Sequence, residues 1–234
     1  MATSATNIKP YKGIGMEGPI AKWYAAQTAR SLDEFKALAR RVAKEIPPQS
    51  KVLEVAPGPG YFAIELAKFG SYQITGLDIS ETFVKIARDN AAKQSVPVEF
   101  RQGNASRMPF GDASFDFLLC RAAFKNFSEP KSALEEMHRV LRPGGRALII
   151  DLRRDASKES INEAVNGMNL GVVNTALTKL TFRFMLLKRA YTKNEFEQLI
   201  SETRFQDFQI REDLIGLEVL LSKHGQTRAD ATRV

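Results

Sequence analysis

Residues 51–62 read KVLEVAPGPGYF, and the fold of the chain can be predicted outward from this stretch. The apolar run 52–55, with Glu54 inside it, is typical of a short buried strand. The loop 56–60 contains two glycines and two prolines, and the residues after it predict a helix over 61–69. A glycine-rich turn between a strand and a helix leaves backbone N–H groups unpaired and adds little side-chain bulk. A nucleotide-sized ligand can therefore approach the main chain here, which predicts a cofactor site.

Apolar and amphipathic segments alternate along the rest of the chain. Further strands are predicted at 72–77, 96–101, 115–120, 147–152, 208–210 and 217–222. Helices are predicted at 31–46, 81–93, 131–141 and 195–201. Nearly continuous apolar strands that alternate with amphipathic helices are typical of a parallel sheet covered on both faces. The predicted fold class is therefore α/β, with a doubly wound, mostly parallel seven-stranded sheet.

Three helix starts carry capping signals. Ser31 and Thr192 each stand three residues before a glutamate, which predicts capping boxes for the helices that follow. Ser80 is predicted to cap the helix over 81–93. The segment Arg142-Pro143-Gly144-Gly145 is predicted to separate a helix from the strand at 147–152.

The pattern divides the chain into five parts. Residues 1–30 are predicted to be an N-terminal arm, either loose or laid over the site, with a short helix that begins near Trp23. The cofactor-binding core covers 31–154, and the region 155–190 lacks a strand signal and is predicted to form a helical cap. A closing helix and two strands at 191–223 complete the core, and 224–234 is predicted to be a flexible tail.

Composition narrows the class of protein without choosing a function. The chain has 234 residues, 26% charged and 44% hydrophobic, which is ordinary for a globular protein. The formal net charge of +7 is spread in small groups, so we attribute it to solubility before nucleic-acid binding. No membrane span or secretory signal is visible, and the single cysteine, Cys120, excludes an internal disulfide. The expected location is the cytoplasm.

Two cofactor classes fit the glycine loop. Residues 58–63 match G-x-G-x-x-A, and Asp78 follows Gly58 by twenty residues (78 − 58), as in a dinucleotide fingerprint. Three features favour S-adenosylmethionine over NAD. Glu54 would repel a pyrophosphate and attract a cationic ligand, and the two loop prolines lack the N–H donors that phosphates use. The loop also contains no basic residue.

A family resemblance also favours S-adenosylmethionine as the cofactor. Residues 52–60, VLEVAPGPG, look like the first motif of class I S-adenosylmethionine-dependent methyltransferases. Five further segments resemble later motifs of that superfamily and occur in the same order: GLDIS, RQGNA, MPF, FDFLLC and RVLRPGGRALII. The segment AFKNFSEP with RVLRPGG behind it is most similar to the ubiquinone/menaquinone-biosynthesis C-methyltransferases and their small-molecule relatives. The resemblance covers about residues 50–152 and implies a Rossmann-like methyltransferase sheet.

The resemblance also implies cofactor contacts. Glu54 would reach the amino group of the cofactor, Asp78 would hold both ribose hydroxyls, and Ile79 would pack on the adenine. The remaining implied contacts are Gly58 and Gly60 beneath the methionine part, Ala56 in the same loop, Asn104 and Ala105 at the adenine edge, and Cys120 and Arg121 beside the methionine moiety. The sequence departs from the family pattern at Ala56, where a glycine is usual, and at Asn104, where an aspartate is common. Neither departure excludes binding.

The candidate catalytic residues are Arg121, Lys125, Tyr24 and Tyr191. Arg121 and Lys125 follow a strand end and could hold an acidic acceptor or stabilise a phenolate, although a surface salt bridge is the alternative for each. Tyr24, with Trp23, could shield a sulfonium or belong to the core. Tyr191 stands at the end of the cap, where packing is its alternative role. No metal site is expected, because the sequence has no cluster of histidines and cysteines.

The function predicted from these observations is transfer of a methyl group from S-adenosylmethionine to a C, O or N atom of a small organic acceptor. Two alternatives are RNA methylation, helped by the positive charge, and cofactor binding without catalysis. The partner expected is a small-molecule methyl acceptor, and nucleic acid is not expected. The cap residues Met168, Phe182, Phe184 and Met185 could line an acceptor pocket, pack on the sheet or form a homodimer seam.

Overall fold

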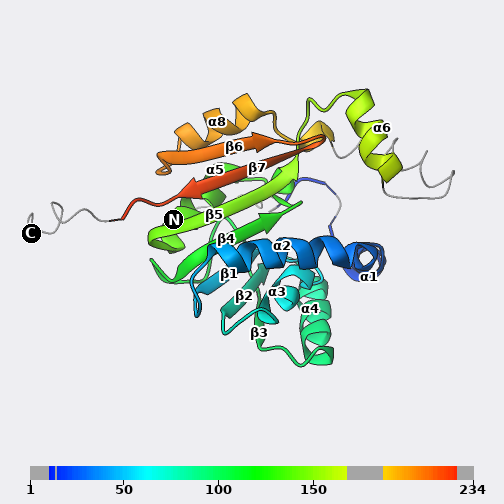
Figure 1. Ribbon diagram of the computed structural model, residues 1–234, viewed down its shortest axis with the longest axis vertical. Helices are drawn as coiled ribbons and strands as arrows, with labels where there is room; N and C mark the ends of the chain where they lie inside the picture. The colour runs from blue at the N-terminus through cyan, green and yellow to red at the C-terminus, as the bar shows by residue number, and fades with distance from the viewer. Residues whose placement is uncertain (1–10, 14, 168–186, 226–234) are drawn as a thin grey trace, which may run out of the picture.

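A computed structural model describes residues 11–13, 15–167 and 187–225, and all structural statements below concern these ranges. Its centre is a seven-stranded sheet in the order β3-β2-β1-β4-β5-β7-β6 (Figure 1). The strands are β1 Lys51–Val55, β2 Gln73–Asp78, β3 Val98–Gln102, β4 Phe115–Arg121, β5 Leu141–Leu152, β6 Asp207–Glu212 and β7 Gly216–Ser222. All neighbouring pairs are parallel except β5–β7 and β6–β7, which are antiparallel. The predicted doubly wound, mostly parallel sheet is confirmed.

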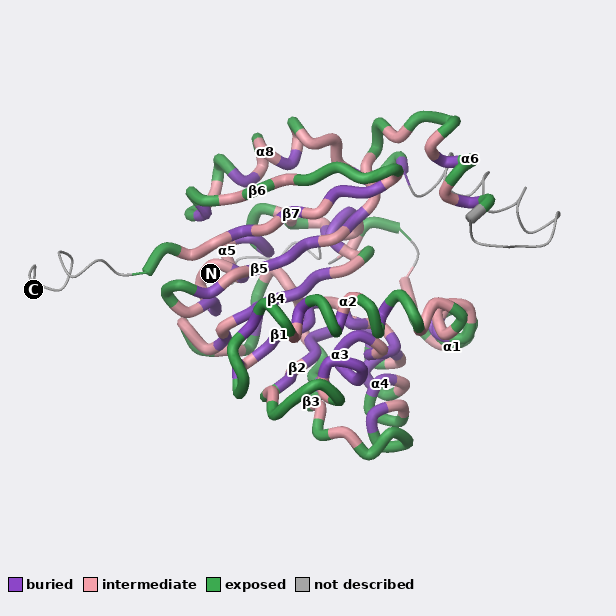
Figure 2. The backbone as a smooth tube through the Cα atoms, in the orientation of Figure 1, coloured by how far each residue is buried: buried purple, intermediate pink, exposed green. Residues whose placement is uncertain are grey.

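Helices cover both faces of the sheet. Their bounds are α1 Gly18–Thr28, α2 Leu32–Glu45, α3 Tyr61–Ala67, α4 Glu81–Lys93, α5 Pro130–Val140, α6 Lys158–Gly167 and α8 Lys193–Ser201. Buried side chains of α2, α3 and α4 pack with Val52 on one face, and those of α5 and α8 pack with Leu53 on the other. Because successive strand residues point to opposite faces, the apolar run of β1 supplies both halves of the core. Figure 2 shows that the central strands are buried along much of their length.

The parallel arrangement brings the carboxyl ends of β2, β1 and β4 to one edge of the sheet. In register, Val55 of β1 pairs with Leu77 of β2, and Glu54 pairs with Leu119 of β4. The loops that follow these three strands therefore lie side by side. Ligands of open α/β sheets bind outside the carboxyl ends of the strands, so this edge is where a site is sought.

The sequence patterns predict the positions of the helices and strands better than they predict where each one begins and ends. The capping box predicted at Thr192 is confirmed, and Ser80 caps α4 by accepting a hydrogen bond from the N–H of Phe83 at 3.0 Å. The capping box predicted at Ser31 is wrong. Ser31 is the last residue of a 3-10 turn that joins α1 to α2, so its backbone is not extended and its side chain makes no capping hydrogen bond.

Two further expectations change. α5 ends at Val140 and β5 begins at Leu141, so the segment 142–145 does not separate them as predicted but lies within the strand, where the register with β4 shifts. Trp23 belongs to the predicted short helix, yet its side chain does not join the core, because the residue is 63% exposed. Of the predicted cap, α6 and the short helix Leu187–Arg189 are described, whereas Met168, Phe182, Phe184 and Met185 lie outside the described residues.

Candidate functional site

The loop between β1 and α3 has a left-handed backbone at three positions. Ala56, Gly58 and Gly60 have φ angles of 56°, 55° and 79°. Glycine adopts this conformation without steric cost, whereas an alanine there is strained by about 1–2 kcal/mol. The alanine that departs from the family pattern therefore takes a glycine-like conformation, held by a 2.8 Å hydrogen bond from its N–H to the carbonyl of Leu77.

The two glycines of the loop serve different purposes. A Cβ atom on Gly60 would lie 2.6 Å from the ring of Phe100 and 3.0 Å from the methyl of Ala87. Gly60 thus allows α3 to start close against α4 and β3. A Cβ on Gly58 would have no atom within 4 Å. Gly58 therefore faces open space, as expected of a backbone segment that a ligand can approach.

We expect Gly60→Ala to lower the free energy of unfolding by about 2–5 kcal/mol, because it adds left-handed strain to a steric clash in a packed core. Gly58→Ala is the matched control, and it is expected to lower the free energy of unfolding by only about 1–2 kcal/mol, since only backbone strain is added. Urea unfolding measures both. Equal destabilisation by the two changes would contradict this division of roles.

Asp78 ends β2 directly beside this loop. Its carboxylate accepts hydrogen bonds from the N–H of Gly58 and from the N–H of Ser80, both at 2.9 Å. Burial raises the pKa of the Asp78 carboxyl to about 6, although these backbone donors act in the opposite direction. Each carboxylate oxygen keeps a further lone pair, so Asp78 can accept hydrogen bonds from a ligand while it orients the loop.

Glu54 is a buried carboxyl group within the strand itself. The residue is 3% exposed, and its Oε2 accepts a hydrogen bond from the N–H of Ala63 in the first turn of α3 at 3.1 Å. Burial raises its pKa to about 8, while the Ala63 N–H and the charge of Arg121 lower it. Without a bound cationic ligand, this group is therefore mostly protonated at pH 7, and a cation that binds beside it would favour its ionised form.

The end of β4 contributes Cys120 and Arg121. The Cys120 side chain is buried in the core cluster beneath the site, and burial raises the pKa of its thiol. The Arg121 guanidinium lies 4.4 Å from the ring centroid of Phe35 and pairs with the carboxylate of Glu34 at 2.7 Å. Ala122, the next residue, has a φ of 59°, so the loops after β1 and β4 both contain a left-handed alanine. Strained backbone of this kind often clusters at ligand sites.

Lys125 does not present its ammonium group to solvent. Its Nζ lies 2.7 Å from Oδ1 of Asp151 and donates to the carbonyl of Ala122 at 2.6 Å, and both side chains of the ion pair are about 5% exposed or less. The backbone N–H of Lys125 also donates to Asp151. The surface salt bridge considered for Lys125 is therefore a buried one, which ties the end of β5 to the turn after β4.

The loop after β3 holds Asn104 and Ala105. The Asn104 side-chain oxygen accepts a hydrogen bond from the N–H of Ser106 at 2.9 Å, and Ala105 packs partly buried against the core. Ile79 is partly exposed after β2, and its carbonyl accepts a hydrogen bond from the side chain of Gln102 at 3.2 Å. These three residues follow adjacent strands, and each is only partly buried.

The N-terminal arm crosses this edge of the sheet. The N–H of Lys12 donates to the carbonyl of Asn126 after β4, and four residues later the carbonyl of Met16 accepts a hydrogen bond from Ser80 Oγ after β2, both at 2.6 Å. The Glu17 carboxylate accepts from the N–H groups of Glu81 and Thr82 at the start of α4. The described residues of the arm therefore bridge the segments that follow β4 and β2, the two strands on either side of β1.

The structure separates the aromatic candidates Tyr24 and Tyr191. Tyr24 on α1 packs edge-on against Phe83 of α4, with ring centroids 5.8 Å apart. Tyr191 packs its ring on Phe124 and Phe196, and its hydroxyl accepts a hydrogen bond from Nζ of Lys12 at 3.4 Å. The residues placed around the loops after β1, β2 and β4 are therefore Glu54, Ala56, Gly58, Asp78 and Arg121, and Tyr191 lies on the β5 side of them.

Sequence reasoning did not find several residues of this region. Asp151 ends β5 as Asp78 ends β2, and its position after an apolar strand was an available signal. Lys12, Met16 and Glu17 had no such signal, because their contacts are made by residues more than sixty positions away. The described ranges contain no group of three or more His, Cys, Asp or Glu side chains placed to hold a metal ion.

Comparison with known proteins gives a family match over the part of the chain that contains the site. Residues 53–149 match the model of a methyltransferase domain. A demethylmenaquinone methyltransferase of Deinococcus radiodurans is 40% identical over 108 residues, which cover 46% of this chain and 45% of the relative. The chain thus spans about half the length of this curated relative.

Among the described helices, none has the length and apolarity required to cross a membrane.

Solved structures match over more of the chain. A protein of Methanococcus maripaludis, proposed to be an S-adenosyl-L-methionine-dependent methyltransferase, superimposes with a TM-score of 0.76 over 93% of this chain and 98% of its own, at 18% identity. The [4+2]-cyclase SpnF superimposes with a TM-score of 0.55 over 82% of this chain and 81% of its own, at 19% identity. Identities this low show a shared fold, and the second example shows that this fold is found in a protein described by a different reaction.

Proposed function

We infer that this chain is a class I S-adenosylmethionine-dependent methyltransferase related to the demethylmenaquinone and ubiquinone/menaquinone-biosynthesis methyltransferases, because residues 53–149 match a methyltransferase domain and such enzymes are 34–40% identical over about half of their length. On that premise, we propose that it transfers a methyl group from S-adenosylmethionine to a C, O or N atom of a small organic acceptor. The observation that carries the proposal is the pair of buried carboxyl groups, Glu54 and Asp78, on either side of a glycine loop that faces open space at Gly58.

The chemistry of these residues fits the cofactor. Asp78 would accept hydrogen bonds from the ribose hydroxyls, and the open backbone at Gly58 leaves room for the methionine part. Glu54 would favour the cofactor's positive charge, which a dinucleotide pyrophosphate does not offer. Ile79, Asn104 and Ala105 would meet the adenine, as proposed from the family resemblance.

The bound cofactor supplies an electrophilic methyl group, and the task of the protein is to align an acceptor with it and exclude water. We propose that the arm, which bridges the segments after β4 and β2, is laid over the site and contributes to the exclusion of water. We propose Arg121, Tyr24 and Tyr191 as groups on the acceptor side. Lys125, whose ammonium is held by Asp151, would act by fixing the turn after β4.

Transfer of tritiated methyl from S-adenosylmethionine into a small-molecule extract of the source cells tests the proposed function. We expect label in the organic fraction, and none in added RNA. Label only in RNA would favour RNA methylation, for which the described residues offer no specific support. Cofactor binding without transfer to either pool would favour a binding protein or a different reaction on the same fold.

Cofactor affinity is expected to rise about five- to tenfold between pH 6.5 and 7.5. The raised pKa of Glu54, about 8, means that the group must lose a proton to pair with the cofactor's ammonium, so binding below pH 8 releases a proton. Above pH 8 the α-amino group itself loses its charge, and affinity should fall again. Calorimetry in buffers of different ionisation enthalpy counts the proton. Glu54→Gln is expected to abolish the release near pH 7, and unchanged proton release in that variant would contradict the assignment.

Two further proposals concern the whole protein. We propose that the chain forms a homodimer through the helical cap, and sedimentation of the purified chain would test this. We also propose a cytoplasmic location, because the one cysteine is a free, buried thiol of the kind that a reducing compartment preserves.

A further inference from the structure

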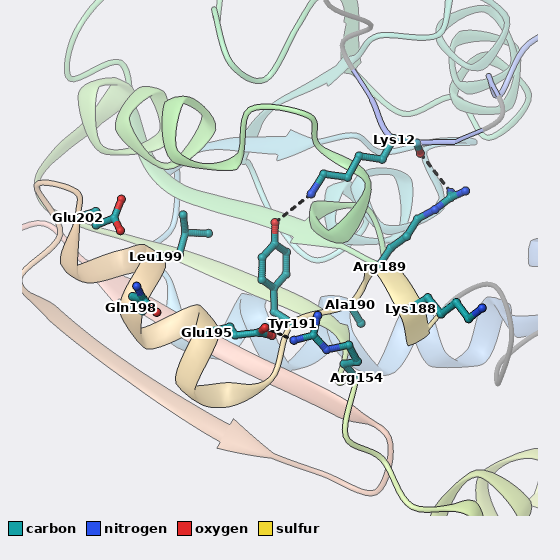
Figure 3. Close-up of a pocket in the computed structure, with 10 residues that line it drawn as sticks. All are labelled: Lys12, Arg154, Lys188, Arg189, Ala190, Tyr191, Glu195, Gln198, Leu199 and Glu202. Atoms are coloured by element: carbon teal, nitrogen blue, oxygen red, sulfur yellow. Dashed lines mark hydrogen bonds and ion pairs between the residues drawn. The ribbon is translucent and has the colours of Figure 1, made fainter.

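A cavity of about 430 Å³ opens on the β5 side of the strand ends. Its volume lies in the range of small-molecule pockets. It is lined by Lys12, Arg154, Lys188, Arg189, Ala190, Tyr191, three residues of α8 (Glu195, Gln198 and Leu199) and Glu202 directly after α8 (Figure 3). These side chains come from the N-terminal arm, the end of β5, the 3-10 turn before α8, and α8 itself. We call this cavity the basic pocket.

The basic pocket has more positive than negative charge, with four basic and two acidic side chains in its lining. Both acidic groups already have partners. Glu195 pairs with Arg154 and accepts a hydrogen bond from the N–H of Thr192, and Glu202 pairs with Lys131 at 3.3 Å. The charge that these pairs leave unbalanced in the lining is that of Lys12, Lys188 and Arg189.

Lys12 and Arg189 are brought together without a carboxylate partner among the described residues. Arg189 Nη1 donates to the backbone carbonyl of Lys12 at 3.2 Å, and the Lys12 ammonium lies 3.4 Å from the Tyr191 hydroxyl. Both cations therefore contact neutral oxygens, although their like charges repel. Figure 3 shows the Lys12 ammonium beside the Tyr191 hydroxyl and the Arg189 guanidinium beside the Lys12 carbonyl, at the other end of Lys12. An anion bound between them would remove the repulsion.

The backbone of the arm is shaped to accommodate Arg189. A Cβ atom on Gly13 would lie 2.0–2.7 Å from the Arg189 guanidinium, and Gly13 has a φ of 105°, which other residues rarely adopt. The guanidinium thus lies flat against a glycine of the arm. The arm is held in turn by the hydrogen bond from Lys12 N–H to Asn126, so its position depends on the turn after β4.

The basic pocket is connected to the strand ends through aromatic contacts. The ring of Tyr191 lies 5.9 Å from that of Phe124, three residues after β4, and Tyr191 also bridges to Arg153 after β5. A molecule held in the pocket would therefore lie beside the loops after β4 and β5, next to the end of the sheet where the cofactor is proposed to bind.

We propose that the basic pocket binds an organic anion through Lys12 and Arg189, with an apolar part of the same molecule against Tyr191, and that this anion is the methyl acceptor. The acceptor class is thus an acid that carries a carboxylate or a phosphate. The assignment as acceptor rests on the proposed methyltransferase function, whereas the binding of an anion does not.

Binding is tested first, with benzoate and phenyl phosphate as probes and benzamide as the neutral analogue. NMR titration of the full-length protein is expected to shift the amide signals of Gly13 and Tyr191 with either acid and to show at least tenfold weaker binding of benzamide. The double variant Lys12→Gln/Arg189→Gln should lose at least tenfold in affinity for the acids. The control is Lys193→Gln, which removes a positive charge at the start of α8, outside the pocket, and should leave the affinity for the acids unchanged.

Equal affinity of the wild type and the double variant for both acids, or equal binding of benzamide, would overturn the inference. Preference for phenyl phosphate over benzoate, or the reverse, identifies which anion the pocket takes. A second measurement compares methyl transfer to a panel of aromatic acids and to their methyl esters.

The two proposals fail in different ways. Acid binding that depends on Arg189, with no transfer to any acid, would refute the acceptor assignment and leave the anion site standing. Transfer to an acid with the same KM in the double variant would refute the basic pocket and leave the methyltransferase function standing. The expected result is a rise in KM of at least tenfold in the double variant, with unchanged cofactor affinity.

Discussion

Asp78→Asn is expected to weaken S-adenosylmethionine binding by about 100-fold. The carboxylate is placed to accept hydrogen bonds from two ribose hydroxyls, and hydrogen bonds to a charged group contribute about 1.5–3 kcal/mol each. An amide keeps the shape of the side chain but loses the charge and one acceptor, so we expect a loss of about 3 kcal/mol in binding. Isothermal titration calorimetry at pH 7.5 measures it, well above the raised pKa of Asp78, about 6.

Stability must be measured beside affinity in this experiment, because Asp78 also orients the N–H groups of Gly58 and Ser80. Asp89→Asn removes the same charge from an exposed position on α4 and is the matched control. Its cofactor affinity should equal that of the wild type. A folded Asp78→Asn protein that binds the cofactor with wild-type affinity would contradict both the site and the assignment of the cofactor.

Lys125→Met is expected to lower the free energy of unfolding by about 3–5 kcal/mol, because it leaves the Asp151 carboxylate buried without its cation. Removing the lysine also removes the hydrogen bond that fixes the carbonyl of Ala122. Urea unfolding followed by circular dichroism gives the value. Lys131→Met is the control, since the Lys131–Glu202 pair is about half exposed and its loss should cost less than about 1 kcal/mol.

A double-mutant cycle isolates the contribution of the pair. The double variant Lys125→Met/Asp151→Leu should be more stable than the sum of the two single losses predicts, because it leaves no buried charge without a partner. Recovery should be partial, since Asp151 also accepts hydrogen bonds from the N–H groups of Lys125 and Leu152. Additive losses would show that the ion pair does not couple the end of β5 to the turn after β4.

The buried ion pair of Lys125 and Asp151 changes the roles assigned to the basic residues at and after the end of β4. Arg121 and Lys125 look equivalent in the sequence, as two basic residues that follow an apolar strand. The structure holds the Lys125 ammonium inside the fold and leaves the Arg121 side chain about a quarter exposed, stacked on Phe35. Burial is a property of what packs on a residue from elsewhere in the chain, so spacing alone could not distinguish the two.

Much of the candidate cofactor site follows from local sequence. The glycine loop, Glu54 and Asp78 were identified because strand periodicity, loop composition and the spacing of twenty residues are local patterns. The contacts of the arm and the basic pocket could not be predicted, because Lys12, Arg154 and Arg189 belong to segments separated by more than thirty residues. The two glycines looked alike in the sequence, and only their neighbours show that Gly60 serves packing and Gly58 faces open space.

The sequence by itself determined the class of the fold, the order of its strands and helices, and the loop beside which a cofactor would bind. These follow from apolar periodicity and turn chemistry, which act over a few residues. The tertiary structure alone decided that Ala56 adopts a left-handed backbone, that Lys125 is paired inside the core, and that the arm brings Lys12 to Arg189. The physical reason is that backbone strain, burial and charge pairing are set by contacts between distant segments, which form only when the sheet is assembled.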